Sequence, residues 1–183
     1  MGTVDWHALA HKLDTLYPNG EKGGSDLGRQ ALELIVGVDA LRSAVDYYIA
    51  GDPGSQLAHS VLAFLQPSSA MERCLEIARS DADADSRRLA VGLLQVVADR
   101  RGIGWAAEFL RDEDEGVQAR GAAIVDQLLW TYRVEPEDCD RILEAMEGHP
   151  SAGVRRAAAL LRDTMTSRRR PAGTADAPGP AGT

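Results

Sequence analysis

Two histidines near the start of the chain have a spacing that could hold a metal ion. His7 and His11 are four residues apart, which places both imidazoles on one face of a helix. A zinc-protease motif would need a glutamate directly after the first histidine and a third ligand, but Ala8 stands there and no third ligand is apparent. We interpret the pair as surface histidines, and we expect no metal and no cofactor.

Acidic residues form a second candidate metal site. Asp81, Asp83 and Asp85 alternate in a pattern similar to the start of a calcium-binding loop. Such a loop needs a glycine at its sixth position and a glutamate at its twelfth, where this chain has Ser86 and Gly92. We therefore expect no calcium site here.

Nucleophilic chemistry also lacks a recognisable arrangement. His59 and His149 have no cysteine or serine neighbour that looks like an activated nucleophile. Cys74 and Cys139 each stand alone, which is typical of small core residues in a reducing compartment. We expect a chain that is not an enzyme.

Composition limits the class of protein further. The chain has 183 residues, a net charge of −8 and 44% hydrophobic residues. An acidic body repels phosphate backbones and disfavours nucleic acid as a partner. The sequence shows no signal peptide and no apolar run of the roughly 20 residues that a bilayer needs, so we expect a cytoplasmic protein without a membrane partner.

Helices account for almost the whole chain. Apolar residues recur with the 3.6-residue period, β-branched alternating runs are missing, and glycine and proline interrupt the pattern at short intervals. Ser69 and Glu72 fit a capping box at one helix start. The pattern predicts ten helices, over residues 5–17, 25–36, 39–49, 54–65, 69–80, 85–99, 105–110, 116–130, 136–147 and 151–165. Residues 166–183, rich in Pro, Gly, Ala and Thr, are expected to form a disordered tail after a domain spanning 1–165.

Every second helix repeats the same apolar offsets, with residues of matching type at the first, fifth and eighth positions. The copies begin at Leu27, Leu57, Arg87, Val117 and Val154, so the intervals are 30, 30, 30 and 37 residues. A single helix pair cannot bury its apolar face, whereas stacked pairs form a continuous core. The period predicts an all-α stack of about five helix pairs, and an irregular helical bundle is the alternative.

Three segments carry a family resemblance: Asp85-Ser-Arg-Arg-Leu-Ala-Val, Glu115-Gly-Val-Gln-Ala-Arg-Gly-Ala-Ala and Ala152-Gly-Val-Arg-Arg-Ala-Ala-Ala-Leu-Leu. Each resembles the second helix of a HEAT-type repeat, and the short period is similar to the HEAT-like repeats of bilin lyases. The resemblance covers most of residues 25–165 and departs from the pattern at Leu27-Gly28 and Leu57-Ala58. It implies an α-α superhelix, a HEAT-like solenoid, and says little about function because the matching positions are packing positions.

In stacked helix pairs the second helices usually line the concave groove, where extended partners bind. This placement predicts a binding site for another protein, built from polar residues near the repeat starts and an aromatic residue at a helix end: Arg29, His59, Arg88, Gln118, Arg120, Arg155, Arg156 and Trp130. Pairing of these arginines with acidic residues of neighbouring repeats is the alternative interpretation. The large aromatic residues Trp6, Trp105, Trp130, Tyr47 and Tyr48 are mostly expected in the core.

Three functions remain open from the sequence. The first is a non-catalytic protein-protein interaction module: an adaptor, an inhibitor or an immunity-type partner. The second is a HEAT-like enzyme or chaperone that acts on a bilin chromophore or on DNA, as the resemblance allows. The third is a structural or self-associating protein.

Overall fold

The computed structural model of the protein describes residues 3–17, 20–21 and 23–169. These residues form an all-helical protein, as predicted, with ten α-helices and one 3-10 turn. The helices are α1 (Trp6–Lys12), α2 (Ser25–Val36), α3 (Val38–Ala50), α4 (Ser55–Leu65), α5 (Ser68–Ala78), α6 (Ala84–Val97), α7 (Gly102–Phe109), α8 (Glu115–Trp130), the 3-10 turn η1 (Pro136–Cys139), α9 (Asp140–Glu147) and α10 (Ala152–Arg169). The last helix continues past the predicted end at residue 165, and the rest of the expected disordered tail, residues 170–183, lies outside the described residues.

The first helix is shorter than the sequence predicts. Its hydrogen-bonded turns end at Lys12, and Asp14 adopts a left-handed backbone with φ of 51°. A short antiparallel pair follows, in which β1 (Leu16–Tyr17) bonds to β2 (Gly20–Glu21). The predicted helix over residues 5–17 is therefore wrong after Lys12, where the left-handed backbone of Asp14 breaks the helix and the chain enters this hairpin.

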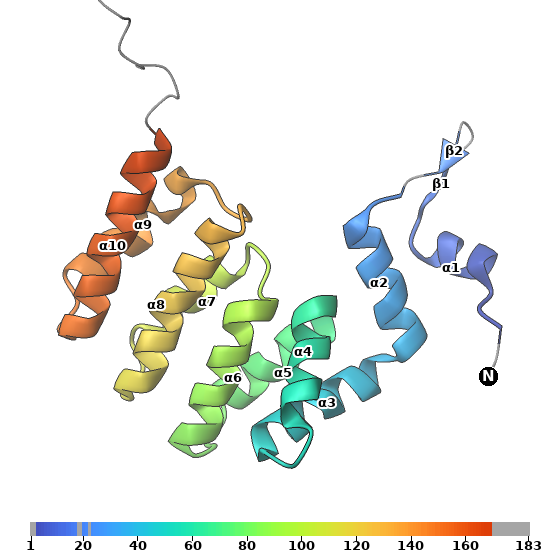
Figure 1. Ribbon diagram of the computed structural model, residues 1–183, viewed down its shortest axis with the longest axis horizontal. Helices are drawn as coiled ribbons and strands as arrows, with labels where there is room; N and C mark the ends of the chain where they lie inside the picture. Colours follow the sequence, from blue (N-terminus) through green and yellow to red (C-terminus); the bar gives the residue numbers. More distant parts are fainter. Residues whose placement is uncertain (1–2, 18–19, 22, 170–183) are drawn as a thin grey trace, which may run out of the picture.

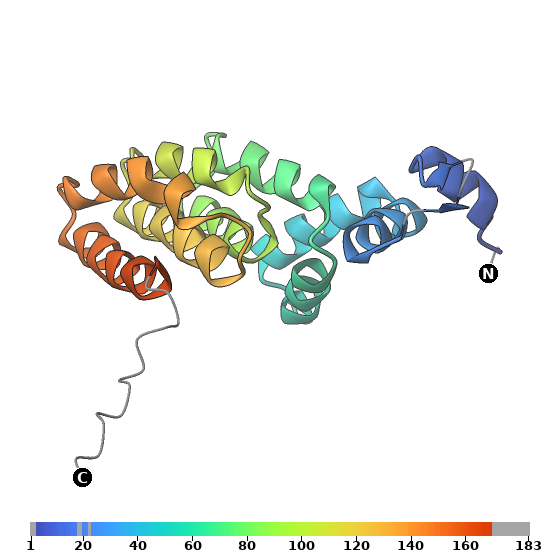
Figure 2. The ribbon, with the colours of Figure 1, turned by 90° about the horizontal axis from the view of Figure 1, so that it is seen from above.

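Helices α3 to α10 form two layers. Each odd-numbered helix packs on the even-numbered helix that follows it, giving the pairs α3–α4, α5–α6, α7–α8 and α9–α10. In the second layer α4 contacts α6, α6 contacts α8 and α8 contacts α10, so these helices lie side by side in chain order (Figure 1). Figure 2 shows the same arrangement from above, with α1 and the hairpin at one end and α10 at the other.

The repeated apolar positions fill the core of three repeats. Val91 and Leu94 on α6 are fully buried, and the matching residues of α8 and α10 are also buried, namely Val117, Gly121, Ile124, Val154, Ala158 and Leu161. On α4 the matching residues are exposed instead: Leu57 by 70%, Val61 by 41% and Phe64 by 75%.

The position of α2 explains this difference. In the later repeats each second-layer helix packs closely on the one before it, whereas α2 makes only a small contact with α4 (Figure 1). Among its described residues α2 buries none, and it turns polar side chains toward the body. The carboxylate of Glu33 accepts the backbone amides of Ser68 and Ser69 at 3.1 and 2.8 Å. Glu33 therefore caps α5, and the predicted capping box of Ser69 with Glu72 is wrong.

The large aromatic residues are less buried than expected. Trp6 is 65% exposed and Tyr47 is 42% exposed, and Trp130 is 70% exposed, as its proposed contact role at a helix end requires. Trp105 and Tyr48 do pack against the core. The core is filled instead by Leu, Val, Ala and Met side chains, which suit the close approach of helices in two layers.

Both cysteines are free and buried. Burial raises the pKa of the Cys74 thiol to about 12 and that of the Cys139 thiol to about 11, and nearby carboxylates act in the same direction. Since the thiolate is the nucleophile, we expect neither cysteine to react with Ellman's reagent at about pH 8 in the folded protein. Addition of denaturant should release both thiols. Rapid reaction of either thiol before unfolding would contradict this account.

Within the described residues, no helix combines the length and apolar character needed to cross a membrane.

Candidate interaction surface

The outer surface of the first layer is covered by ion pairs between neighbouring helices. Arg42 of α3 pairs with Glu76 of α5 at 2.5 Å, and Arg73 of α5 pairs with Asp46 of α3 at 2.8 Å. Hydrogen bonds from Arg42 and then from Arg73, which lies 3.0 Å from Glu76, lower the pKa of the Glu76 carboxyl. Arg79 and Glu108 continue the series between α5 and α7 at 2.7 Å. The charges of this layer are thus largely paired within the protein.

The second layer presents a different surface. Its four helices all carry large apolar side chains that are exposed, namely Leu57, Val61, Phe64, Leu89, Trp130 and Leu160. In the first layer, α3 exposes Val38 by 46% and Tyr47 by 42%, while the described residues of α5, α7 and α9 include no exposed large apolar side chain. Clustered exposed apolar groups on one face are typical of surfaces that bind other proteins.

Three of the predicted binding residues meet at one place in this layer. His59 of α4, Arg88 of α6 and Arg120 of α8 line a small cavity of about 200 Å³. The ring of His59 lies against Tyr48, with centroids 5.2 Å apart. The side chain of Arg120 lies against α6. A Cβ atom added to Gly92 of α6 would be 3.5 Å from Nε of Arg120.

Arg88 confirms the alternative interpretation, in which an arginine pairs with a neighbouring repeat. Its Nε and Nη2 donate to the two carboxylate oxygens of Asp114 at 2.7 and 2.5 Å, and Nη1 donates to Asp85 at 2.7 Å. This bidentate contact raises the pKa of Arg88 and holds that of Asp114 well below its usual range. Asp114 also accepts the amide of Val117 and so caps α8. The side chain of Arg88 therefore links two neighbouring repeats through these hydrogen bonds.

Two other predicted residues act within the chain. Gln118 donates from Nε2 to the carbonyl of Asp112 at 2.7 Å, and its buried Oε1 has no hydrogen-bond partner among the described residues. Arg155 donates to the carbonyls of His149 and Pro150, both at 2.6 Å. Both side chains position the loops that precede their helices.

Arg120, Arg156 and Trp130 remain available to a partner. Among the described residues neither arginine forms an ion pair, and both are exposed. The indole of Trp130 is 70% exposed at the end of α8. Exposed tryptophan and unpaired arginine are the residue types enriched where binding energy concentrates.

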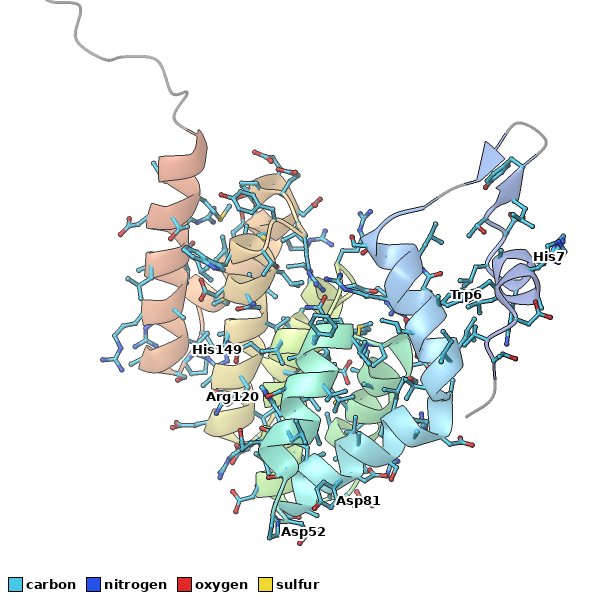
Figure 3. The ribbon with its side chains drawn as sticks, turned by 45° about the vertical axis from the view of Figure 1, so that its right-hand side comes forward. Trp6, His7, Asp52, Asp81, Arg120 and His149 are labelled. Carbon is cyan, nitrogen blue, oxygen red and sulfur yellow. The ribbon has the colours of Figure 1, made fainter. Side chains whose placement is uncertain are left out.

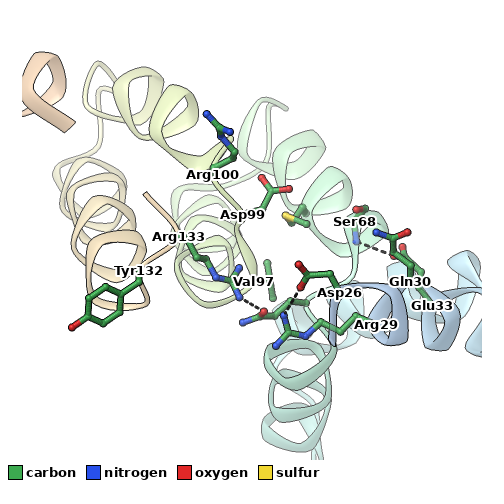
Figure 4. Close-up of a pocket in the computed structure, with 12 residues that line it drawn as sticks. Asp26, Arg29, Gln30, Glu33, Ser68, Val97, Asp99, Arg100, Tyr132 and Arg133 are labelled. Carbon is green, nitrogen blue, oxygen red and sulfur yellow. Dashed lines mark hydrogen bonds and ion pairs between the residues drawn. The ribbon is translucent and has the colours of Figure 1, made fainter. Parts of the chain in front are cut away.

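A larger cavity, of about 490 Å³, lies where α2 faces the C-terminal ends of α4, α6 and α8. Arg29, predicted from the sequence, lines it together with Arg133, which the sequence did not indicate (Figure 4). Nη1 of Arg133 donates to the carbonyl of Ala98 at 2.6 Å, and Nη2 donates to the side-chain oxygen of Gln66. Burial is the main cause that lowers the pKa of Arg133, and the positive charge of the nearby Arg29 acts in the same direction.

The other histidines do not contribute to these surfaces. His7 and His11 contact each other edge-on at 4.6 Å on α1, and Figure 3 shows His7 at one end of the molecule, far from Arg120. His149 is held in its loop, where Nδ1 accepts the amide of Ser151 and Nε2 lies 2.8 Å from the carbonyl of Leu110. No group of three or more metal-binding side chains occurs among the residues that the structure describes.

Comparison of the chain with protein-family models, with curated proteins and with solved structures finds no match.

Proposed function

We propose that this protein is a non-catalytic protein-binding module whose partners dock on the second layer of helices. The difference between its two surfaces carries the proposal. The first layer pairs its charges in Arg42–Glu76, Arg73–Asp46 and Arg79–Glu108, while the second layer exposes apolar side chains beside unpaired arginines. Exposed apolar side chains gain free energy when a partner buries them, and a carboxylate of the partner can offset the desolvation of an unpaired arginine.

The order of helix contacts supports a repeat architecture for this module. We place α3 to α10 in a HEAT-like solenoid, because the even-numbered helices contact one another in sequence and three of them, α6, α8 and α10, bury the same offsets. In such a stack the second layer would form the concave groove. The cytoplasm suits the protein as its compartment, since two free cysteines are stable in a reducing environment.

Charge reversal and truncation of exposed residues test the proposed function. The full chain would be used as bait in a cell lysate, with Arg120→Glu and Trp130→Ala as separate variants. Truncation of an anchoring tryptophan commonly costs about 2 kcal/mol or more, or about 30-fold in affinity, so we expect partners to be lost with either variant.

Arg141→Glu is the matched control for this experiment. Arg141 is an exposed arginine on α9, in the first layer, and forms no ion pair among the described residues. Its reversal changes the net charge by the same amount as Arg120→Glu and should leave capture intact. If Arg141→Glu abolished capture while the second-layer variants kept it, the binding surface would have to be moved to the first layer.

A further inference from the structure

The exposed apolar stripe on α4 faces the space beside α2. Leu57, Val61 and Phe64 follow the i, i+4, i+7 spacing of one helix face. His59, which lines the small cavity shared with α6, lies about 140–160° around the helix from each of them at 100° per residue. The stripe therefore points away from α6, and α2 is the helix on that side of α4 (Figure 1).

The stripe is long enough to take part in a helix-helix contact. Seven residues of rise correspond to about 10 Å, or two helical turns. Helices that bind in grooves present apolar anchors at the same i, i+3 or i+4, and i+7 positions. Leu57 and Phe64, at 70% and 75% exposure, are the two ends of this stripe.

The cavity that Arg29 and Arg133 line lies just beyond the C-terminal end of α4, and Leu57, Val61 and Phe64 do not line it. Gln66, two residues after Phe64, lines the cavity and accepts a hydrogen bond from Arg133. Arg29 and Arg133 reach toward each other from α2 and from the loop after α8, whereas Arg100 points away (Figure 4). Two guanidinium groups thus converge at one end of an apolar stripe.

The carboxylates that line this cavity are already engaged. Glu33 accepts the amides of Ser68 and Ser69, and Asp99 accepts from Arg101 at 2.9 Å. Asp26 pairs with Arg29 at a long 3.4 Å. Arg133 forms no ion pair among the described residues and donates only to uncharged oxygens. The cavity therefore has donors left for one more carboxylate.

We propose that the surface between α2 and α4 binds an amphipathic helix of another protein, whose apolar side chains cover Leu57, Val61 and Phe64 and whose terminal turn places a carboxylate beside Arg29 and Arg133. This inference rests on the proposed function and names the chemistry of the partner. Charge favours such a partner over a second copy of this chain, since two chains of net charge −8 repel each other.

Synthetic helices of about 20 residues test the pairing of stripe and cavity. All peptides would carry leucines at i, i+4 and i+7. One peptide would have two glutamates at its N-terminal end, a second would have two glutamates at its C-terminal end, and the control peptides would have glutamines in place of those glutamates. Fluorescence anisotropy with the full chain should show one glutamate peptide binding about tenfold more tightly than the glutamine peptide, because a carboxylate gains charge-assisted hydrogen bonds. Equal affinities, or no binding by either glutamate peptide, would overturn the proposal.

Variants of the chain locate the site. Phe64→Ser and Arg29→Gln alter exposed or weakly paired side chains, so circular dichroism should stay unchanged while affinity for the glutamate peptide falls about tenfold. Leu160→Ser is the matched control, because Leu160 is 69% exposed on α10. Binding that survives Phe64→Ser and is lost with Leu160→Ser would also overturn the proposal.

Sedimentation of the full chain over a range of concentrations tests the alternative occupant. A dimer that Phe64→Ser dissolves would assign the stripe to a second copy and reject the partner helix. If the peptides fail while capture from lysate still depends on Arg120 and Trp130, the proposed function stands and only this inference falls.

Discussion

Replacement of Leu94 by alanine should destabilise the protein by about 2–5 kcal/mol, while replacement of Phe64 should change its stability by less than about 0.5 kcal/mol. The two residues occupy the same position in successive repeats. Leu94 is fully buried between the two layers, whereas Phe64 is 75% exposed. Truncation of Leu94 therefore removes buried contacts and leaves a cavity, and truncation of Phe64 removes surface that water already covers.

Chemical denaturation followed by far-UV circular dichroism measures both free energies of unfolding. The two substitutions are controls for each other, since each shortens an apolar side chain at the eighth position of the repeat. A similar large loss for both variants would show that Phe64 is buried in solution, and α2 would then have to close onto α4. The partner-helix proposal depends on the opposite result.

Replacement of Gly121 by valine should destabilise the protein by about 2–3 kcal/mol, whereas valine at Gly92 should have an effect within about 0.5 kcal/mol. Both glycines lie inside second-layer helices. At Gly121 an added Cβ would lie 2.8 Å from Cβ of Phe109 and 3.4 Å from the carbonyl oxygen of Ala106. Helix α7 thus packs directly on α8 at this point, and a side chain would push the two layers apart.

At Gly92 the nearest atoms belong to the Arg120 side chain, 3.5 Å away. Arg120 is exposed and flexible enough to move, and valine is a slightly better helix former than glycine. Thermal unfolding should therefore separate the two variants clearly. Equal melting temperatures for the two valine variants would mean that α7 and α8 do not make the close contact described here.

The packing residues could be predicted from the sequence with good accuracy. The repeated apolar spacing correctly predicted the buried residues of α6, α8 and α10. The positions of glycine and proline predicted most helix ends to within a few residues. This succeeded because helical periodicity and turn-forming residues act locally, through the burial of one face and through backbone geometry. The pattern misled on two helices: Leu57 and Phe64 of α4 have core spacing but exposed positions, and α2 buries none of its described residues.

The candidate site was less predictable, because pairing depends on which side chains other elements bring near. Arg88 and Arg120 look alike as arginines on successive repeats, yet Asp114 engages Arg88 while Arg120 forms no ion pair among the described residues. No sequence pattern pointed to Arg133. Its position in the cavity depends on hydrogen bonds to the carbonyl of Ala98 and the side chain of Gln66, which are 35 and 67 residues away in the chain.

The sequence alone thus determined that the chain is helical, where most of its helices lie and which faces of the later repeats are apolar, because these properties follow from neighbours a few residues apart. Only the tertiary structure decided that α2 makes little contact with α4, that the charges of the first layer are largely paired and that Arg29 converges with Arg133. Those features depend on how whole helices are placed against one another. No spacing along the chain records that placement.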